Sequence, residues 1–363
     1  MRLIIDAHLD LAYNALHFNR DQTEELALIN QREAGLTDGK ARGTACVNLP
    51  EMRRGKIAVC LATVLSRAKR EVQPKPGAFR LDIDFGTQHM AYASAQGHLA
   101  YYRTLQRQGE LQPIQTAADL REHWDRWQKD ESPDLPIGYI LAMEGADPIV
   151  EPEDVDLWWE DGLRSLILAH YGKGHYSEGT GCEGGLTEKG KRLLPELDRL
   201  GMILDLTHTT DRSFDEAMDQ FSGPVMASHS NCRALAHNQR QFNDEQIATL
   251  IDRGAVIGVA FDAWMITENW VRGESTPEGL KIAAIVDHID HYCQLAGNAN
   301  HVAIGSDLDG GFGAEQRPSD LHSIADLQQL DEILSSRGYS DDDIDKILHG
   351  NWMNFFLKHL PAK

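Results

Sequence analysis

The chain has 363 residues, of which 42% are hydrophobic and 25% charged, the composition of a folded globular protein. Its net charge of -21 argues against nucleic acids and anionic membranes as main partners, because most of its surface would repel a polyanion. Five cysteines without CxxC spacing argue against a disulfide framework or a thiolate zinc site.

The first apolar run, RLII, is short and soon reaches charged residues, so we expect neither a signal peptide nor a membrane span. Together with the few cysteines, this favours a cytoplasmic protein. Barrels of parallel strands and helices often reach this length as one domain, so residues 1–363 are expected to form a single domain.

Eight short apolar runs are expected to be β-strands. The first two are RLIIDAHLD and KIAVCLATVL, and a helical insertion is expected over about 86–130. From residue 137 the runs alternate with amphipathic segments, one of which has leucines at 193, 194, 197 and 200 and another a capping box at Ser213 to Glu216. The tail DDDIDKILHGNWMNFFLKHL predicts a terminal helix. This order predicts an α/β fold, a (β/α)₈ TIM barrel with inserted helices and a C-terminal helical tail.

Most of the predicted strands end in a residue that can bind a divalent metal. His8 and Asp10 follow the first strand as H-x-D, and the later strands end at Glu144, His170, His208, His229 and Asp307. All strand C-termini of such a barrel open on one face, so these side chains are expected to converge. Carboxylates and imidazoles are common ligands of zinc and similar metals, which predicts a metal site there.

Several further polar residues are weighed against this set. Asp307 is expected to accept a proton in the reaction, and Asp309 is the alternative residue for this role. The loops 172–185 and 310–319 are expected beside the site, and His175 and Asp262 are also expected in loops there. The two histidines of DHIDH (287–291) are expected on the solvated side of a helix. The basic clusters RRGK (53–56) and RAKR (67–70) are expected to be solvated surface.

Three long stretches, GLTEKGKRLLPELDRLGMILDLTH, ASHSNCRALAHNQRQFND and HVAIGSDLDGG, resemble the membrane dipeptidase (renal dipeptidase) family of the amidohydrolase superfamily. The resemblance implies two zinc ions per subunit, one held by His8, Asp10 and Glu144 and the other by Glu144, His208 and His229. Other divalent transition metals suit the same ligands. Glutamate stands where many superfamily members use a carboxylated lysine.

By the same resemblance, His170 polarises the scissile carbonyl and Arg240 pairs with the substrate carboxylate. Asp307, a carboxylate on the last strand, is expected to take the proton from a metal-bridging water and pass it to the leaving nitrogen. The implied activity is hydrolysis of a small dipeptide, with L-Xaa-D-Xaa substrates included, by a hydroxide that bridges the metals. A homodimer without membrane attachment is expected. Two alternatives stay open: an amidohydrolase acting on N-acyl-amino acids or cyclic amides, and a non-catalytic metal-binding barrel.

Overall fold

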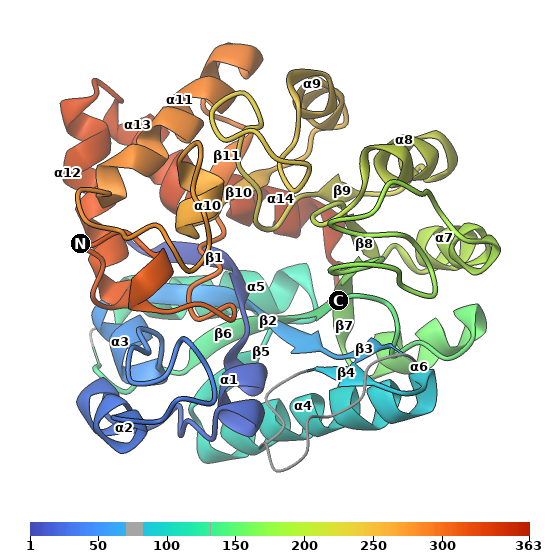
Figure 1. The fold of residues 1–363 in the computed structure, drawn as a ribbon, viewed down its shortest axis with the longest axis horizontal. Helices are drawn as coiled ribbons and strands as arrows, with labels where there is room; N and C mark the ends of the chain where they lie inside the picture. Colours follow the sequence, from blue (N-terminus) through green and yellow to red (C-terminus); the bar gives the residue numbers. More distant parts are fainter. Residues whose placement is uncertain (70–82, 131) are drawn as a thin grey trace.

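The computed structural model describes residues 1–69, 83–130 and 132–363, so Arg70 of the RAKR cluster lies outside the described residues. Eight parallel strands form the predicted barrel (Figure 1). In sheet order they are β10 (Ile257–Val259), β11 (Val302–Ile304), β1 (Ile4–Leu9), β2 (Ile57–Leu65), β6 (Ile137–Glu144), β7 (Leu163–Ile167), β8 (Ile203–Asp205) and β9 (Val225–Met226). Every residue of β1, β2 and β6 is buried, as expected for strands covered on both faces.

The ring closes between β9 and β10 through one isolated parallel bridge, Ala227 to Ile257. There the amide of Gly258 donates to the carbonyl of Ala227 at 2.8 Å, and the amide of Ala227 donates to the carbonyl of Val256 at 3.1 Å. By contrast, β2 and β6 pair continuously from Val59–Gly138 to Leu65–Glu144. The barrel is therefore complete but much more weakly paired at this seam.

Helices follow most strands and surround the barrel (Figure 1). They are α1 (Leu11–His17), α2 (Leu26–Glu33), α3 (Leu49–Arg54), α6 (Val155–Glu160), α7 (Glu188–Leu200), α8 (Asp211–Gln220), α9 (Asp244–Asp252), α10 (Ala263–Ile266), α11 (Ile285–Ala296) and α12 (Gln329–Ser336). Helix α7 buries Leu193, Leu194 and Leu197 at the predicted spacing. It ends at Gly201, whose φ of 71° suits a left-handed C-cap. No helix among the described residues is long and apolar enough to cross a bilayer.

Two local predictions are wrong in detail. The insertion is two helices, α4 (Gln88–Gln108) and α5 (Ala117–Lys129), separated by the short strand β5 (Leu111–Pro113), which pairs with β6 outside the ring. Gly109, with φ of 81°, ends α4. The cap of α8 is Thr210, whose side chain accepts from the Ser213 amide, so Ser213 lies inside the helix.

The C-terminal tail is helical as predicted, with α13 (Asp341–Asp345) and α14 (Asn351–His359) joined by a π-helical turn at Lys346–Gly350. Trp352 Nε1 donates to the carbonyl of Ile304 at 2.9 Å, and Asn351 Nδ2 donates to the carbonyls of Ala299 and Val302. These bonds fix the tail against β11 and so help to hold the strand that precedes Asp307.

Candidate metal centre and active site

One carboxylate oxygen lies at the centre of the converging strand ends. Glu144 Oε1, at the end of β6, faces the Nε2 atoms of four histidines. The distances are 3.6 Å to His8, 3.6 Å to His170, 3.2 Å to His208 and 3.4 Å to His229. Residues scattered from position 8 to 229 therefore meet at one mouth of the barrel.

Three overlapping groups of side chains have ligand atoms close enough to share a metal ion. They are His8, Glu144 and His229; Glu144, His170 and His208; and His8, Asp10 and Asp307, with all ligand atoms in a group within 4.8 Å of one another. His8 Nε2 is buried and has no hydrogen-bond partner among the described residues. A buried, unpartnered imidazole nitrogen beside three carboxylates is what a cation site requires.

Hydroxyl groups orient two of the imidazoles from behind. His208 Nδ1 lies 2.9 Å from Thr180 Oγ1, and His229 Nδ1 lies 2.8 Å from Ser228 Oγ. A hydroxyl can accept the Nδ1 proton, which leaves the Nε2 lone pair toward Glu144. Both rings are thus held in the orientation that a metal ligand needs.

The electrostatics of this cluster favour added positive charge. Burial raises the pKa of Glu144 to about 8, and the neighbouring carboxylates of Asp10 and Asp307 act in the same direction. Burial likewise raises the pKa of Asp307 to about 8. Burial opposes protonation of His8, but the charges of Glu144, Asp10 and Asp307 together raise its pKa to about 10. Several carboxylates packed in a buried site need a compensating cation.

The backbone is unusual where the functional side chains leave their strands. His208, Asp307 and Asp309 have φ of 65°, 58° and 59°, in the left-handed region that L-residues seldom adopt. Such conformations persist where surrounding structure holds them, and they gather at functional sites. Their position here agrees with a site built at the strand ends.

The two rival aspartates have different surroundings. Asp309 is buried and accepts hydrogen bonds from the amides of Cys46 and Val47, with Arg20 3.6 Å away. Its carboxylate fastens one loop to another. Asp307 instead lines the cavity, with Oδ1 3.8 Å from His8 Nε2. The geometry therefore favours Asp307 as the reacting carboxylate.

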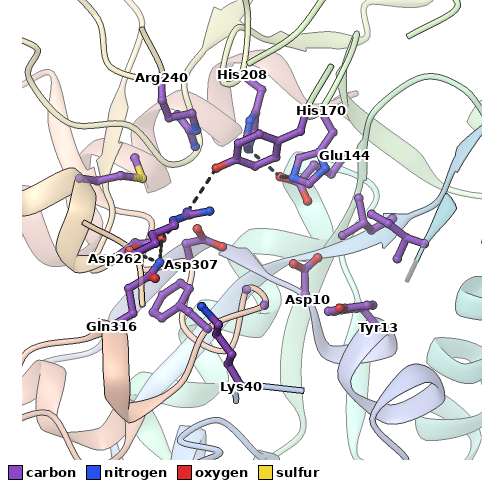
Figure 2. A pocket seen from close by; sticks show the side chains of 18 of the residues that line it. Asp10, Tyr13, Lys40, Glu144, His170, His208, Arg240, Asp262, Asp307 and Gln316 are labelled. Carbon is purple, nitrogen blue, oxygen red and sulfur yellow. Dashed lines mark hydrogen bonds and ion pairs between the residues drawn. The ribbon is translucent and has the colours of Figure 1, made fainter. Parts of the chain in front are cut away.

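A cavity of about 460 Å³ opens above the cluster, and Figure 2 shows its side chains. Arg240 lies on its wall, 3% exposed, with Nη2 donating to the carbonyl of His229 at 2.8 Å. Arg240 Nε has no partner, and no carboxylate forms an ion pair with this guanidinium, within the described part of the chain. A buried guanidinium with unused donors beside the metal cluster is suited to an anionic ligand.

The other weighed residues do not join the metal cluster. His175 Nδ1 lies 3.1 Å from Asp147, and Asp262 caps α10 and lines the cavity with Gln316 and Arg272 as partners. His288 is buried, so its predicted solvation is wrong. Its Nδ1 accepts from the Cys232 amide and its Nε2 donates to the carbonyl of Ile266.

One cluster expected to be solvated surface belongs partly to the site. Arg67 lines the cavity with its side chain 17% exposed, and Lys69 binds the carbonyls of Tyr171 and Lys173. The prediction for RAKR is therefore wrong at these two residues. Composition shows that a basic cluster exists, but not that it follows a strand whose C-terminal end opens at the site. The position of Arg67 two residues beyond the apolar run ending at Leu65 is a signal that could have found it.

Comparison with known proteins gives a match to the membrane dipeptidase family, peptidase family M19, over residues 2–358. An uncharacterised protein of Klebsiella pneumoniae is 30% identical over 254 residues, or 68% of this chain and 88% of the relative. A dipeptidase of Claviceps purpurea is 28% identical over 52% of this chain and 43% of its own length. The chain thus spans about half the length of the curated dipeptidases it matches, or less.

Two solved structures share the fold over 99% of both chains at 24% identity. One is the dipeptidase AC of peptidase family M19, with a TM-score of 0.77. The other is a metallopeptidase from Rhodobacter sphaeroides liganded with a phosphinate mimic of L-Ala-D-Ala, with a TM-score of 0.75. At this identity the likeness establishes the barrel architecture.

Proposed function

Because the chain belongs to the membrane dipeptidase family of metallopeptidases, we propose that it hydrolyses the peptide bond of small dipeptides with two divalent metal ions, zinc by preference. The observation that carries this proposal is the placement of Arg240. Its buried, unpaired guanidinium contacts the main chain of His229 within the metal cluster.

The position of Arg240 limits the length of the substrate. A C-terminal carboxylate stands only one α-carbon away from the nitrogen of the bond before it. A clamp for that carboxylate, directly beside the metal ligands, therefore selects the last peptide bond of a chain. The acidic groups Asp10 and Asp307 on the same cavity are complementary to a free ammonium group, which favours a dipeptide over a longer or acylated substrate.

His8, Asp10, Glu144, His208 and His229 would hold the metals, with Glu144 shared between them. When bound, the cations lower the pKa of a water molecule and polarise the scissile carbonyl. His170 Nε2 faces the same point as the ligand atoms and can donate to the carbonyl oxygen as negative charge develops on it. Asp307 accepts a proton and returns it to the leaving nitrogen.

N-acyl-amino acids also carry a free carboxylate that Arg240 could bind, so the carboxylate alone does not distinguish the two activities. The comparison must therefore vary both end groups of the substrate. The test uses purified protein with measured metal content and a panel of L,L and L,D dipeptides. Each dipeptide is compared with its C-terminal amide and its N-acetyl derivative, with and without a chelator. The likeness to the Rhodobacter sphaeroides structure supports including L-Ala-D-Ala.

We expect the free dipeptide to be cleaved fastest, and the chelator to stop turnover. Equal rates for a dipeptide and its amide would remove the carboxylate clamp. Faster cleavage of the N-acetyl derivative would favour the rival, and protein that binds metal but cleaves no amide would favour a non-catalytic barrel. The homodimer and the cytoplasmic location stay predictions, for gel filtration and cell fractionation to test.

A further inference from the structure

Every nitrogen of the Arg67 guanidinium has a hydrogen-bond partner, and the three partners are Asp84, His170 and the carbonyl of Tyr171. It lies on β3 (Arg67–Ala68), which pairs in register with β4 (Asp84–Phe85). Nε and Nη2 donate to the two carboxylate oxygens of Asp84 at 2.7 and 3.0 Å. The remaining nitrogen, Nη1, lies 3.2 Å from His170 Nδ1. The bidentate pair fixes the plane of the guanidinium and so the direction of the third group.

This contact determines where the proton of a neutral His170 resides. A guanidinium has only donors, so the Nδ1 atom that faces it must be the acceptor. The single proton of the neutral imidazole is then on Nε2, which lies 3.6 Å from Glu144 Oε1. That distance is too long for a hydrogen bond, so the Nε2 proton is available to another acceptor.

The same reasoning separates His170 from the other histidines around Glu144. His208 and His229 meet hydroxyl groups at Nδ1, and a hydroxyl can accept a proton. Their Nε2 atoms can therefore present a lone pair to a metal, whereas the Nε2 of His170 presents a proton. Distance alone would make His170 a metal ligand, because it lies in one of the three ligand groups.

We propose that Arg67, anchored by Asp84, is a positioning residue that holds His170 as the Nε2–H tautomer and so makes it a hydrogen-bond donor to the scissile carbonyl instead of a metal ligand. This inference rests on the proposed function for the identity of the acceptor. Arg67 would act through His170, since Nη1, the nitrogen nearest the imidazole, faces His170 Nδ1 and the Tyr171 carbonyl, and the rest of the fork is held by Asp84.

The kinetic test is a double-mutant cycle with Arg67→Met and His170→Ala, assayed on the best dipeptide after metal analysis. Removal of a donor to the developing oxyanion costs roughly 100–1,000-fold in kcat, so misorienting this donor should cost at least about 10-fold in kcat, with KM and metal content unchanged. In the His170→Ala background, Arg67→Met should have no further effect. Arg53→Met is the matched control. Like Arg67, Arg53 forms an ion pair with a carboxylate, that of Glu110 at 2.6 Å, but Arg53 does not line the cavity.

An equal loss from Arg67→Met in both backgrounds, or an equal loss from Arg53→Met, would overturn the proposal. A second readout does not depend on turnover: ¹⁵N spectra of histidine-labelled, zinc-loaded protein, with the His170 signals assigned by their absence in His170→Ala. We expect Nε2–H in the wild type and a mixture with Nδ1–H in Arg67→Met. A wild-type His170 protonated on Nδ1 would refute the tautomer even if catalysis proceeds. Wild-type turnover by His170→Ala would instead refute the proposed function of His170.

Discussion

Gly310 lies where any side chain would displace Asp307, so Gly310→Ala tests the position of that carboxylate. A Cβ at position 310 would stand 1.9 Å from Asp307 Oδ1 and 2.8 Å from both Asp307 Cγ and its carbonyl oxygen. The φ of Gly310 is outside the left-handed region, so the substitution acts through this collision alone.

Non-bonded heavy atoms settle about 3.5 Å apart, so the carboxylate would have to move by more than about 1 Å. A misplacement of about 1 Å in a catalytic group can cost roughly 100-fold in rate. We therefore expect kcat to fall about 100-fold, equivalent to about 2.7 kcal/mol of transition-state stabilisation. Metal content should be retained, because the three atoms nearest to the new methyl group all belong to Asp307 and none to the residues proposed to hold the metals.

The assay is kcat on a dipeptide, together with metal analysis and thermal unfolding. Gly97→Ala is the control, because a Cβ there meets nothing within 4 Å and the residue lies inside α4. An unchanged kcat in Gly310→Ala would refute the assignment of Asp307 as the proton carrier. Equal losses in both variants would refute the steric reasoning.

Three further substitutions have defined outcomes. Arg240→Met removes a charged hydrogen-bond donor, so kcat/KM for a dipeptide should fall by about 10–100-fold, while the slower rate on the dipeptide amide should not change; a parallel fall on the amide would contradict the clamp. Thr180→Val removes the partner of His208 Nδ1 and should weaken metal binding about 10–100-fold in a chelator competition, which an unchanged affinity would contradict. Burial alone would raise the pKa of Glu33, but Arg20 and a second arginine hold it below its usual value. A carboxylate whose pKa is lower in the folded than in the unfolded protein stabilises the fold at pH values above its unfolded pKa. This stabilisation is lost as the pH falls through the folded pKa. Glu33→Gln should therefore unfold more easily in denaturant at pH 7, with the difference from wild type narrowing below about pH 4; a constant difference would contradict the ion pair.

The barrel and the convergence of its strand ends could be predicted because both follow from short-range patterns. Apolar runs of strand length alternate with amphipathic helices, and parallel connection places every strand C-terminus on one face. That rule alone brings His8, at one end of the chain, beside Glu144 and His229.

The supporting contacts could not be predicted because they depend on the paths of loops. Thr180 reaches His208 from the loop after β7, and Arg67 reaches His170 from a strand pair outside the ring. The prediction that both histidines of DHIDH are solvated was wrong for His288, for a similar reason. Helical periodicity gives the spacing of faces, whereas burial of His288 depends on Cys232 and Ile266 packing against it.

The seam between β9 and β10 has a dynamic consequence. Local openings begin where backbone pairing is sparse, and here a single bridge pair at Ala227 joins the two edges, as a single pair also joins β1 and β11. His229 stands two residues beyond that bridge, and its ring lies 3.6 Å from the ring of His8 on β1. A metal ion bound by both histidines would hold β9 and β1 together and oppose opening of the seam. The hydrogen-exchange rate of the Gly258 amide should therefore fall as the metal occupancy of the site rises.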